Sequence, residues 1–307
     1  MRQPAAILAT LFLLLTAACG ADPAAPPSPP ASGSFPVTID YQGTAVEIPA
    51  RPERIVSLSP TATEILFAIG AGDQVVAVDA FSDFPADAPV TDLDGSSPNL
   101  EAISSYQPDL VVAWIDPNEV LPGLGRIDVP ALLHPSATTL DDTYAQIEQL
   151  GAATGHVAEA AEVVARMRTD LDAIVAEVPD RPEPLSYYHE LDPTLYSVTG
   201  DTFLGQLYGL LGLRSIADPS GADSQYPQLS AEFIVDADPD VILLADAQCC
   251  GVDTAELAGR PGWDELTAVR EDRVIPLDED LASRWGPRVV DLLRDLAAEL
   301  ATLAPAG

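Results

Sequence analysis

Two glutamates stand at matching places in two copies of one short pattern. Glu101 lies seven residues before Pro108, and Glu232 lies seven residues before Pro239. Each proline is followed by aspartate and then by a continuous apolar run. Because the residue before a proline is pushed out of the helical conformation, each copy predicts a short helix that ends before a buried strand. Paired carboxylates on paired units predict two acidic groups that hold one partner from two sides through charge-assisted hydrogen bonds.

A second set of candidate residues is mostly aromatic and lies near the ends of expected strands. In open parallel sheets, ligands bind beyond the carboxyl ends of the strands. The residues expected there are Phe81, Trp114, Tyr188, Tyr226, Arg284 and Trp285. A cleft lined by aromatic rings and a few polar groups suits a bulky, partly apolar ligand. These six residues are the predicted ligand-binding set, and ordinary core packing is the alternative role for each aromatic ring.

The elements that would position these residues alternate between strands and helices. In the first half we expect a hairpin over 37–49, strands at 55–58 and 75–78, and a helix over 61–69. Thr61 and Glu64 match the capping box that begins a helix. A comparable series starts near residue 185. The alternation predicts two similar Rossmann-like α/β lobes with parallel sheets and a ligand cleft between them.

The segment between the two series predicts one long helix. Apolar residues recur there at steps of three and four: Val157, Ala160, Val164, Met167, Leu171, Ile174 and Val178. A helix over 156–178 would extend roughly 35 Å at the usual rise per residue, and Pro179 would end it. We expect this helix to bridge the two lobes and to limit how far they hinge.

The N-terminus has the pattern of an export signal. Arg2 precedes a short apolar stretch, and small residues lead to Cys19, as in the cleavage box of bacterial lipoproteins. Thr16 departs from the leucine most common in that box. We expect lipid on Cys19, and so a location at the outer face of the cytoplasmic membrane or in the periplasm. The predicted domains are a signal peptide at 1–18, a Pro/Ala/Ser-rich tether at 19–34, a first lobe at 35–140, a helical region at 141–179 and a second lobe at 180–307.

Charge and cysteine content narrow the function classes. The formal charge is −34, and the chain contains arginine but no lysine. Because the net charge is so negative, the surface repels nucleic acid and anionic lipid headgroups. Cys249 and Cys250 are adjacent, and they form either a vicinal bridge or two thiols. Three scattered histidines do not complete a zinc site with them.

An enzyme is not indicated by the motifs. The nucleophile elbow, the dinucleotide-binding glycine pattern and the phosphate-binding loop are all missing from the sequence. An uncharacterised exported enzyme stays a weak alternative. Direct metal binding through His134, His189 and Asp246 is another, although their spacing is not that of a ligand set.

The chain resembles the substrate-binding proteins of bacterial ABC importers for ferric siderophores and cobalamin. The segments that carry the resemblance are 54–66, 98–101 with 108–111, 227–232, 260–263 and 273–274. It implies two α/β lobes bridged by one long helix, and a monomer that delivers its ligand to a permease dimer with a cytoplasmic ATPase. It also implies that Glu101 and Glu232 dock on arginines of the permease, one from each lobe.

The resemblance leaves the ligand open between a ferric siderophore, which we expect first, and cobalamin or another corrinoid. Haem is less expected. In cobalamin-binding members, aromatic rings of both lobes sandwich the corrin, and Phe81, Trp114 and Tyr226 fall at those places. Gly95 departs from that pattern, because such members can place tryptophan there. An anionic siderophore needs a cation in the cleft, for which Arg284 is the first candidate and Arg214 and Arg126 are the alternatives.

Overall fold

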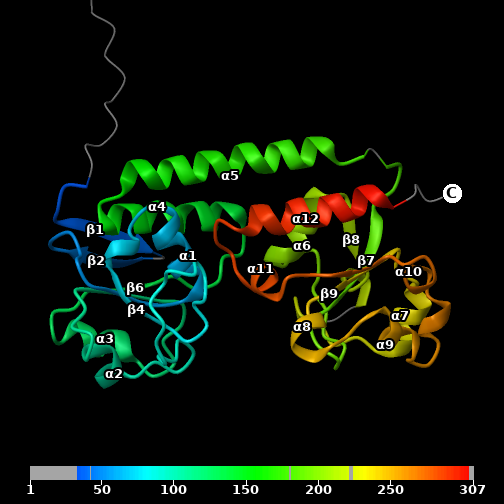
Figure 1. The fold of residues 1–307 in the computed structure, drawn as a ribbon, viewed down its shortest axis with the longest axis horizontal. Coiled ribbons are helices and arrows are strands. Elements are labelled where there is room, and N and C mark those ends of the chain that lie inside the picture. Colours follow the sequence, from blue (N-terminus) through cyan, green and yellow to red (C-terminus); the bar gives the residue numbers. More distant parts are fainter. Residues whose placement is uncertain (1–32, 42, 180, 221–223, 304–307) are drawn as a thin grey trace, which may run out of the picture. The chain divides into compact units, whose positions relative to one another are not determined.

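A computed structural model of the chain describes residues 33–41, 43–179, 181–220 and 224–303. The chain divides into the units 1–31 and 32–307, and the described residues belong to the second (Figure 1). The predicted signal peptide, nearly all of the tether and Cys19 lie outside the described residues. Within the described part, none of the helices is long and apolar enough to cross a membrane.

The first lobe is built on a four-stranded parallel sheet. In spatial order its strands are β4 (Val75–Val78), β3 (Ile55–Leu58), β5 (Leu110–Ala113) and β6 (Ala131–Leu133). Its helices are α1 (Pro60–Ala68), η1 (Gly72–Gln74), α2 (Leu100–Ser104) and α3 (Val120–Gly125). An antiparallel hairpin of β1 (Val37–Tyr41) and β2 (Thr44–Ile48) precedes the sheet, as predicted.

The second lobe repeats this sheet. Its strands in spatial order are β8 (Leu213–Ser215), β7 (Leu185–Glu190), β9 (Val241–Leu244) and β10 (Val274–Pro276), all parallel. In both sheets the strand that comes first along the chain lies between the second and the third, and the fourth follows the third. The shared order confirms the two similar α/β lobes. Each glutamate unit precedes the third strand of its sheet, because α2 leads to β5 and α7 (Ala231–Ala237) leads to β9.

The remaining helices of the second lobe are short. They are α6 (Phe203–Leu210), η2 (Asp218–Ser220), α8 (Ala247–Cys250), α9 (Thr254–Ala258), η3 (Trp263–Glu265), α10 (Thr267–Arg270) and α11 (Glu279–Ser283).

Three long helices pack together along the two lobes. They are α4 (Leu140–Thr154), α5 (Val157–Glu177) and α12 (Val289–Thr302), and α5 packs against the other two (Figure 1). The predicted stripe of α5 is buried from Ala160 to Ile174, and its 21 residues extend about 31 Å. Gly155 has a φ of 82° between α4 and α5, a left-handed conformation that glycine adopts without strain. The long bridging helix is confirmed.

The apolar core explains why the strands are apolar on both faces. One cluster runs from the hairpin through α4, α5 and α12 to Tyr187 and Tyr208 in the second lobe. Two smaller clusters cover the opposite face of each sheet, one around Val111 and one around Ile242. Residues of β3, β5 and β9 are buried along their whole length. Strands covered on both faces do not alternate apolar and polar residues.

The start of α1 differs from the prediction. Ser59 is the N-cap, and its hydroxyl accepts a hydrogen bond from the Ala62 amide. Pro60 occupies the first helical turn, where a missing N–H costs nothing. The predicted capping box of Thr61 with Glu64 is therefore wrong. The Glu64 carboxylate binds Arg284 instead.

Candidate functional site: an aromatic cleft between the lobes

Two adjoining cavities lie where the two lobes face each other. Their volumes are about 420 and 500 Å³. The first-lobe wall consists of Pro60, Thr61, Asp79, Phe81, Ser96 and Trp114. The second-lobe wall consists of Leu191, Phe203, Leu204, Tyr226, Ala245, Glu279 and Ala282. Both cavities touch Ser136, Asp280, Ser283, Arg284 and Trp285, so we treat them as one cleft. Several wall residues directly follow the carboxyl ends of strands, where ligands bind in such sheets.

Four of the predicted aromatic residues line this cleft. Phe81 and Trp114 come from the first lobe, Tyr226 comes from the second, and Trp285 touches both cavities. Phe81 is 68% exposed and Tyr226 is 49% exposed. Large rings left open to solvent in a cavity are available to a ligand, because the protein itself does not cover them.

Trp285 is held in place by the first lobe. Its indole N–H donates to Oε1 of Gln146 in α4 at 3.0 Å. The other end of that amide is also fixed, because its NH₂ group donates to the Pro135 carbonyl at 2.8 Å. A ring anchored at its polar tip presents its apolar body at a constant position. Trp285 therefore forms a fixed part of the cleft rather than an adjustable one.

Arg284 lines both cavities, but its charge is already paired. Its guanidinium binds the carboxylates of Glu64 at 2.6 Å, Asp280 at 2.7 Å and Asp83 at 2.8 Å. The Phe81 carbonyl accepts a further bond at 3.1 Å. The side chain is 7% exposed. Burial opposes its charge, but the bonds to Glu64 and Asp83 outweigh that effect and raise the pKa of Arg284. The residue is placed as expected, yet it offers no free cation to a ligand.

The other ionisable groups of the cleft are acidic. Among the described residues that line it, Asp79, Glu279 and Asp280 carry carboxyl groups, and Arg284 is the one basic residue. Burial raises the pKa of Asp79, although Ser82 donates a hydrogen bond to it at 2.6 Å. Burial also raises the pKa of Asp280. The surface presented to a ligand is thus aromatic with an acidic margin.

Gly95 is explained by crowding at the first-lobe wall. A Cβ atom added there would lie 2.3 Å from Oδ2 of Asp79 and 2.8 Å from the Leu58 carbonyl oxygen. The second contact is with backbone, which cannot swing away. Tryptophan at this position would require the wall to shift.

Tyr188 does not line either cavity, contrary to the expectation that placed it among the ligand residues. Its side chain is fully buried, and its ring meets that of Trp263 edge-on at 5.9 Å. The reason is the length of β7, which continues to Glu190. Tyr187 and Tyr188 point to opposite faces of that strand, and helices cover both faces. We therefore leave Tyr188 out of the ligand-binding set.

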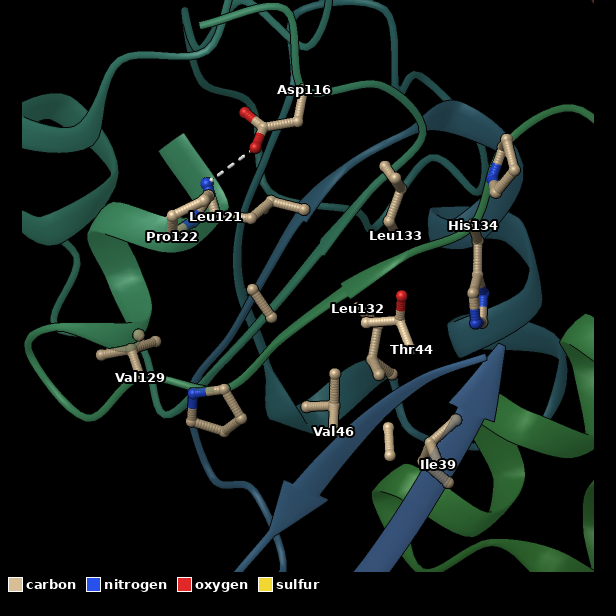
Figure 2. A pocket seen from close by; sticks show the side chains of 15 residues that line it. Ile39, Thr44, Val46, Asp116, Leu121, Pro122, Val129, Leu132, Leu133 and His134 are labelled. Carbon is tan, nitrogen blue, oxygen red and sulfur yellow. Dashed lines mark hydrogen bonds between the residues drawn. The ribbon is translucent and has the colours of Figure 1, made fainter. Parts of the chain in front are cut away.

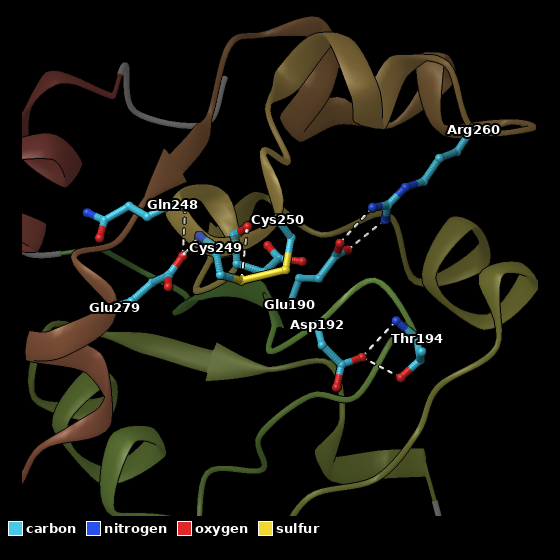
Figure 3. The surroundings of a disulfide bond; sticks show 9 residues. Glu190, Asp192, Thr194, Gln248, Cys249, Cys250, Arg260 and Glu279 are labelled. Atoms are coloured by element: carbon cyan, nitrogen blue, oxygen red, sulfur yellow. Dashed lines mark hydrogen bonds and ion pairs between the residues drawn. A yellow bond between two sulfur atoms is a disulfide. The ribbon is translucent and has the colours of Figure 1, made fainter. Parts of the chain in front are cut away.

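Beyond the end of β7 lies a buried ionic cluster that the sequence did not reveal. Two guanidinium nitrogens of Arg260 each bind a carboxylate oxygen of Glu190 at 2.7 Å, as Figure 3 shows. Asp246, fully buried after β9, lies beside them. Burial raises the pKa of Asp246 to about 7, and the neighbouring carboxylate of Glu190 acts in the same direction.

Phe203 and Glu279 also line the cleft, although no sequence motif indicated them.

The fold does not group His134, His189 and Asp246, the residues considered as direct metal ligands, into a cluster. His189 stacks on Tyr208 in the core, and burial lowers its pKa to about 3. His134 lies in the first lobe, where burial lowers its pKa to about 4. Across the described residues, no group of three or more His, Cys, Asp or Glu side chains could hold a metal ion.

A separate cavity of about 570 Å³ lies wholly within the first lobe. It opens between the hairpin and the edge strand β6, and its wall is mainly apolar (Figure 2). Its acidic residue, Asp116, accepts hydrogen bonds from the amides of Val120 and Leu121 and thereby caps α3. No residue of the second lobe contributes to this cavity.

The two glutamate units have matching geometry. Asn99 caps α2 by accepting from the Ala102 amide, and Ser230 caps α7 by accepting from the Phe233 amide. Glu101 and Glu232 are exposed in the first turns of these helices. The helix dipole favours a carboxylate in the first turn of a helix. The carboxylates of Glu101 and Glu232 are both exposed, so a partner protein can bind them.

The aspartates of the two Pro-Asp pairs also have matching roles. Asp109 accepts hydrogen bonds from the amides just before β3, and Asp240 accepts from the amide and hydroxyl of Ser186 in β7. Each aspartate ties the start of the third strand to the start of the first. The repeated sequence pattern is thus a repeated structural unit.

The sequence profile of the family described as periplasmic binding protein matches residues 55–281. The chain belongs to the periplasmic binding protein family. The protein is accordingly a solute-binding protein of an ABC importer, and its relatives are transport proteins. The uncharacterized ABC transporter substrate-binding lipoprotein YvrC of Bacillus subtilis is 32% identical over 98% of this chain and 98% of its own. A cobalamin-binding protein of Halobacterium salinarum is 31% identical over 95% of this chain and 82% of its own.

Solved periplasmic binding proteins share the fold. A possible iron-binding protein of Staphylococcus epidermidis matches with a TM-score of 0.73 and 27% identity, over 82% of this chain and 99% of its own. The periplasmic vitamin B12 binding protein BtuF of Vibrio cholerae matches with a TM-score of 0.67 and 28% identity, over 82% of this chain and 97% of its own. The names of these two proteins refer to different ligands, iron for the first and vitamin B12 for the second.

Proposed function

We propose that this binding protein carries a corrinoid of the cobalamin type to its importer. The observation that carries the proposal is the pairing of Arg284 with Glu64, Asp83 and Asp280. It leaves the cleft with exposed aromatic faces and carboxylates but without a free cation among its described residues. An anionic ferric siderophore would meet uncompensated negative charge there, which disfavours binding.

A corrinoid matches what the cleft offers. It presents a large, flat ring that can lie against aromatic side chains, and its amide arms can accept or donate hydrogen bonds at a polar margin. Phe81 and Trp114 stand on one wall and Tyr226 on the other, so a ring placed between them would contact both lobes. The likeness to cobalamin-binding and B12-binding relatives supports the same ligand class.

Delivery is assigned to the two exposed glutamates. Glu101 and Glu232 occupy the same structural position on the two lobes, outside the described cleft wall. We propose that each docks on an arginine of the permease dimer. Lipid on Cys19 would hold the protein at the outer face of the cytoplasmic membrane, and one copy would carry one ligand.

The test is a calorimetric titration of the full-length protein with cyanocobalamin, a ferric catecholate, a ferric hydroxamate and haemin. We expect one-to-one binding of cyanocobalamin and weaker or undetectable binding of the others. Trp114→Ala should weaken cyanocobalamin binding by about 2 kcal/mol or more, as for a central aromatic contact. Tyr196→Ala is the matched control, because Tyr196 is 40% exposed but lines neither cavity. Saturable binding of a siderophore or haemin without binding of cyanocobalamin contradicts the proposal.

A further inference from the structure

Cys249 and Cys250 form a disulfide between adjacent residues at the end of α8 (Figure 3). The sequence left open whether they were bridged or free. Both residues are exposed, so reagents in solution can reach the sulfur atoms. Neither the cleft wall nor the docking glutamates account for this pair.

The disulfide lies next to the ligand cleft. Ala245, which lines the cleft, is separated from α8 only by the buried Asp246. Glu279 also lines the cleft, and its Oε1 accepts hydrogen bonds from the amides of Gln248 at 2.6 Å and Cys249 at 2.7 Å. The backbone that carries the disulfide is therefore bonded directly to a cleft side chain.

The base of the same turn is held from the other side. The Cys250 amide donates a hydrogen bond to the Asp246 carbonyl oxygen at 3.1 Å. Asp246 sits beside Glu190, which the guanidinium of Arg260 holds with two bonds. The turn of the two cysteines is thus connected on one side to the buried cluster of Asp246, Glu190 and Arg260. On the other side it is hydrogen-bonded to Glu279 at the cleft, and the disulfide lies at the exposed end of the turn.

We propose that the Cys249–Cys250 disulfide forms part of the second-lobe rim of the cleft, and that its reduction to two thiols weakens ligand binding. This proposal rests on the proposed corrinoid-binding function. The reductant is an external dithiol. Its thiolate attacks one of the two sulfur atoms, the Cys249–Cys250 bond breaks, and a mixed disulfide forms. The second thiol of the reductant then displaces the protein sulfur, so that both cysteines end as thiols and the reductant leaves as a disulfide.

The coupling to ligand binding runs through the Cα atom of Cys249. While the sulfur atoms are joined, this atom belongs to a small ring that contains the peptide between the two cysteines, and the torsions of the ring are restricted. The Cys249 amide that Glu279 binds is attached to the ring at this atom. Opening the ring releases the torsions that fix the atom in the turn, and with them the position of the amide. Glu279 would then lose one of its two amide partners, and its position in the cleft wall would be less defined. Exported proteins meet an oxidising environment, so the bridged form is the resting one.

The experiment compares cyanocobalamin affinity in two redox states of the full-length protein. One sample is kept oxidised, and the other is reduced with dithiothreitol, which is removed by anaerobic gel filtration before calorimetry. Free thiols are counted in both samples. We expect the dissociation constant to rise about fivefold or more on reduction, as for coupling between linked sites. The double variant Cys249→Ser, Cys250→Ser should resemble the reduced protein and should not respond to dithiothreitol.

The outcomes separate this proposal from the function it rests on. Equal or tighter binding by the reduced protein overturns the role of the disulfide and leaves corrinoid binding intact. A failure of the oxidised protein to bind cyanocobalamin overturns the function itself. A change in affinity on dithiothreitol treatment of the double variant would show that the effect does not come from Cys249 and Cys250, and would also overturn the proposal.

Discussion

The carboxylate of Glu64 in α1 binds the guanidinium of Arg284, a residue 220 positions later in the chain, at 2.6 Å. The same carboxylate oxygen accepts a bond from Arg288 at 2.6 Å. Glu64 is almost completely buried, so its charge is satisfied by these two arginines rather than by water. The contact joins the first lobe to the segment between α11 and α12, directly behind the cleft. It fixes the two walls relative to each other and removes the charge of Arg284 from the ligand surface.

Replacing Glu64 by alanine should strongly destabilise the protein. The change leaves Arg284 buried next to Arg288 without the carboxylate that both bind, and breaking such a buried pair costs about 3–5 kcal/mol. The free energy of unfolding, measured by urea denaturation, should fall by about that amount. Arg294→Ala serves as the control, because the side chain is half exposed and its pairs with Asp170 and Asp291 are surface contacts. That variant should lose no more than about 1 kcal/mol, and an equal loss in both variants would refute the interlobe role of Glu64.

Replacing either docking glutamate should impair transport without impairing binding. Glu101→Ala or Glu232→Ala removes an exposed carboxylate that lines no part of the cleft, so the affinity for ligand should stay near that of the unmodified protein. Binding to the reconstituted importer should weaken by about 2 kcal/mol or more per lost contact. For the unmodified protein, a higher salt concentration should weaken its complex with the importer.

The control for docking is Glu162→Ala, since Glu162 is an exposed glutamate on α5, away from both units. It should support full uptake of radiolabelled ligand. Full uptake by both docking variants, or a loss of ligand affinity in either, would show that the docking assignment is wrong.

Tryptophan emission should report ligand in the cleft through Trp114. Trp263 is buried in the core of the second lobe, whereas Trp114 and Trp285 line the cleft. We expect cyanocobalamin to quench the emission of the unmodified protein, and Trp114→Phe to remove part of that quenching. If calorimetry shows binding while the Trp114→Phe variant is quenched as fully as the parent, Trp114 does not line the binding site.

The buried carboxyl of Asp246 should make stability fall as pH rises. Its folded-state pKa of about 7 lies above its ordinary value, so the folded protein holds a proton there that the unfolded chain has lost. The contribution to stability is therefore lost as pH rises toward and through 7. Relative to Asp246→Asn, the free energy of unfolding should fall by about 1–3 kcal/mol between pH 5 and pH 8.

Taking the difference between the two proteins cancels the opposite contribution of the buried histidines, which destabilise the fold at low pH. Asp295→Asn, at an exposed position of α12, should keep the pH profile of the parent. A difference between parent and Asp246→Asn that does not change with pH would contradict the raised pKa.

Most of the fold was predictable because it depends on local patterns. Proline-terminated helices before β5 and β9, and the apolar stripe of α5, identify the two lobes and their bridge without any knowledge of contacts. Phe81 and Trp114 were also predictable as cleft residues, since residues after parallel strands share one edge of the sheet. Tyr226 lies in the loop before α7 and Trp285 follows α11, so strand ends alone do not place them. Tyr188 was misplaced because apolar residues in sequence do not show where β7 ends.

The ionic contacts could not be predicted, because they join residues far apart in the chain. Glu64 matches a capping box three residues after Thr61, and nothing local indicates that it reaches Arg284. In the same way, the sequence does not show that Arg260 binds Glu190 or that Glu279 binds the turn of Cys249. Charge pairing of this kind depends on the folded arrangement, and it decides whether Arg284 can serve a ligand.

Competition for the cleft tests corrinoid binding directly. Full-length protein is mixed with equal concentrations of cyanocobalamin, a ferric hydroxamate, a ferric catecholate and haemin, and native mass spectrometry identifies the bound species. We predict one cyanocobalamin per chain, with occupancy reduced by Trp114→Ala and unchanged by Tyr196→Ala. A ferric siderophore or haemin as the dominant bound species would contradict corrinoid binding.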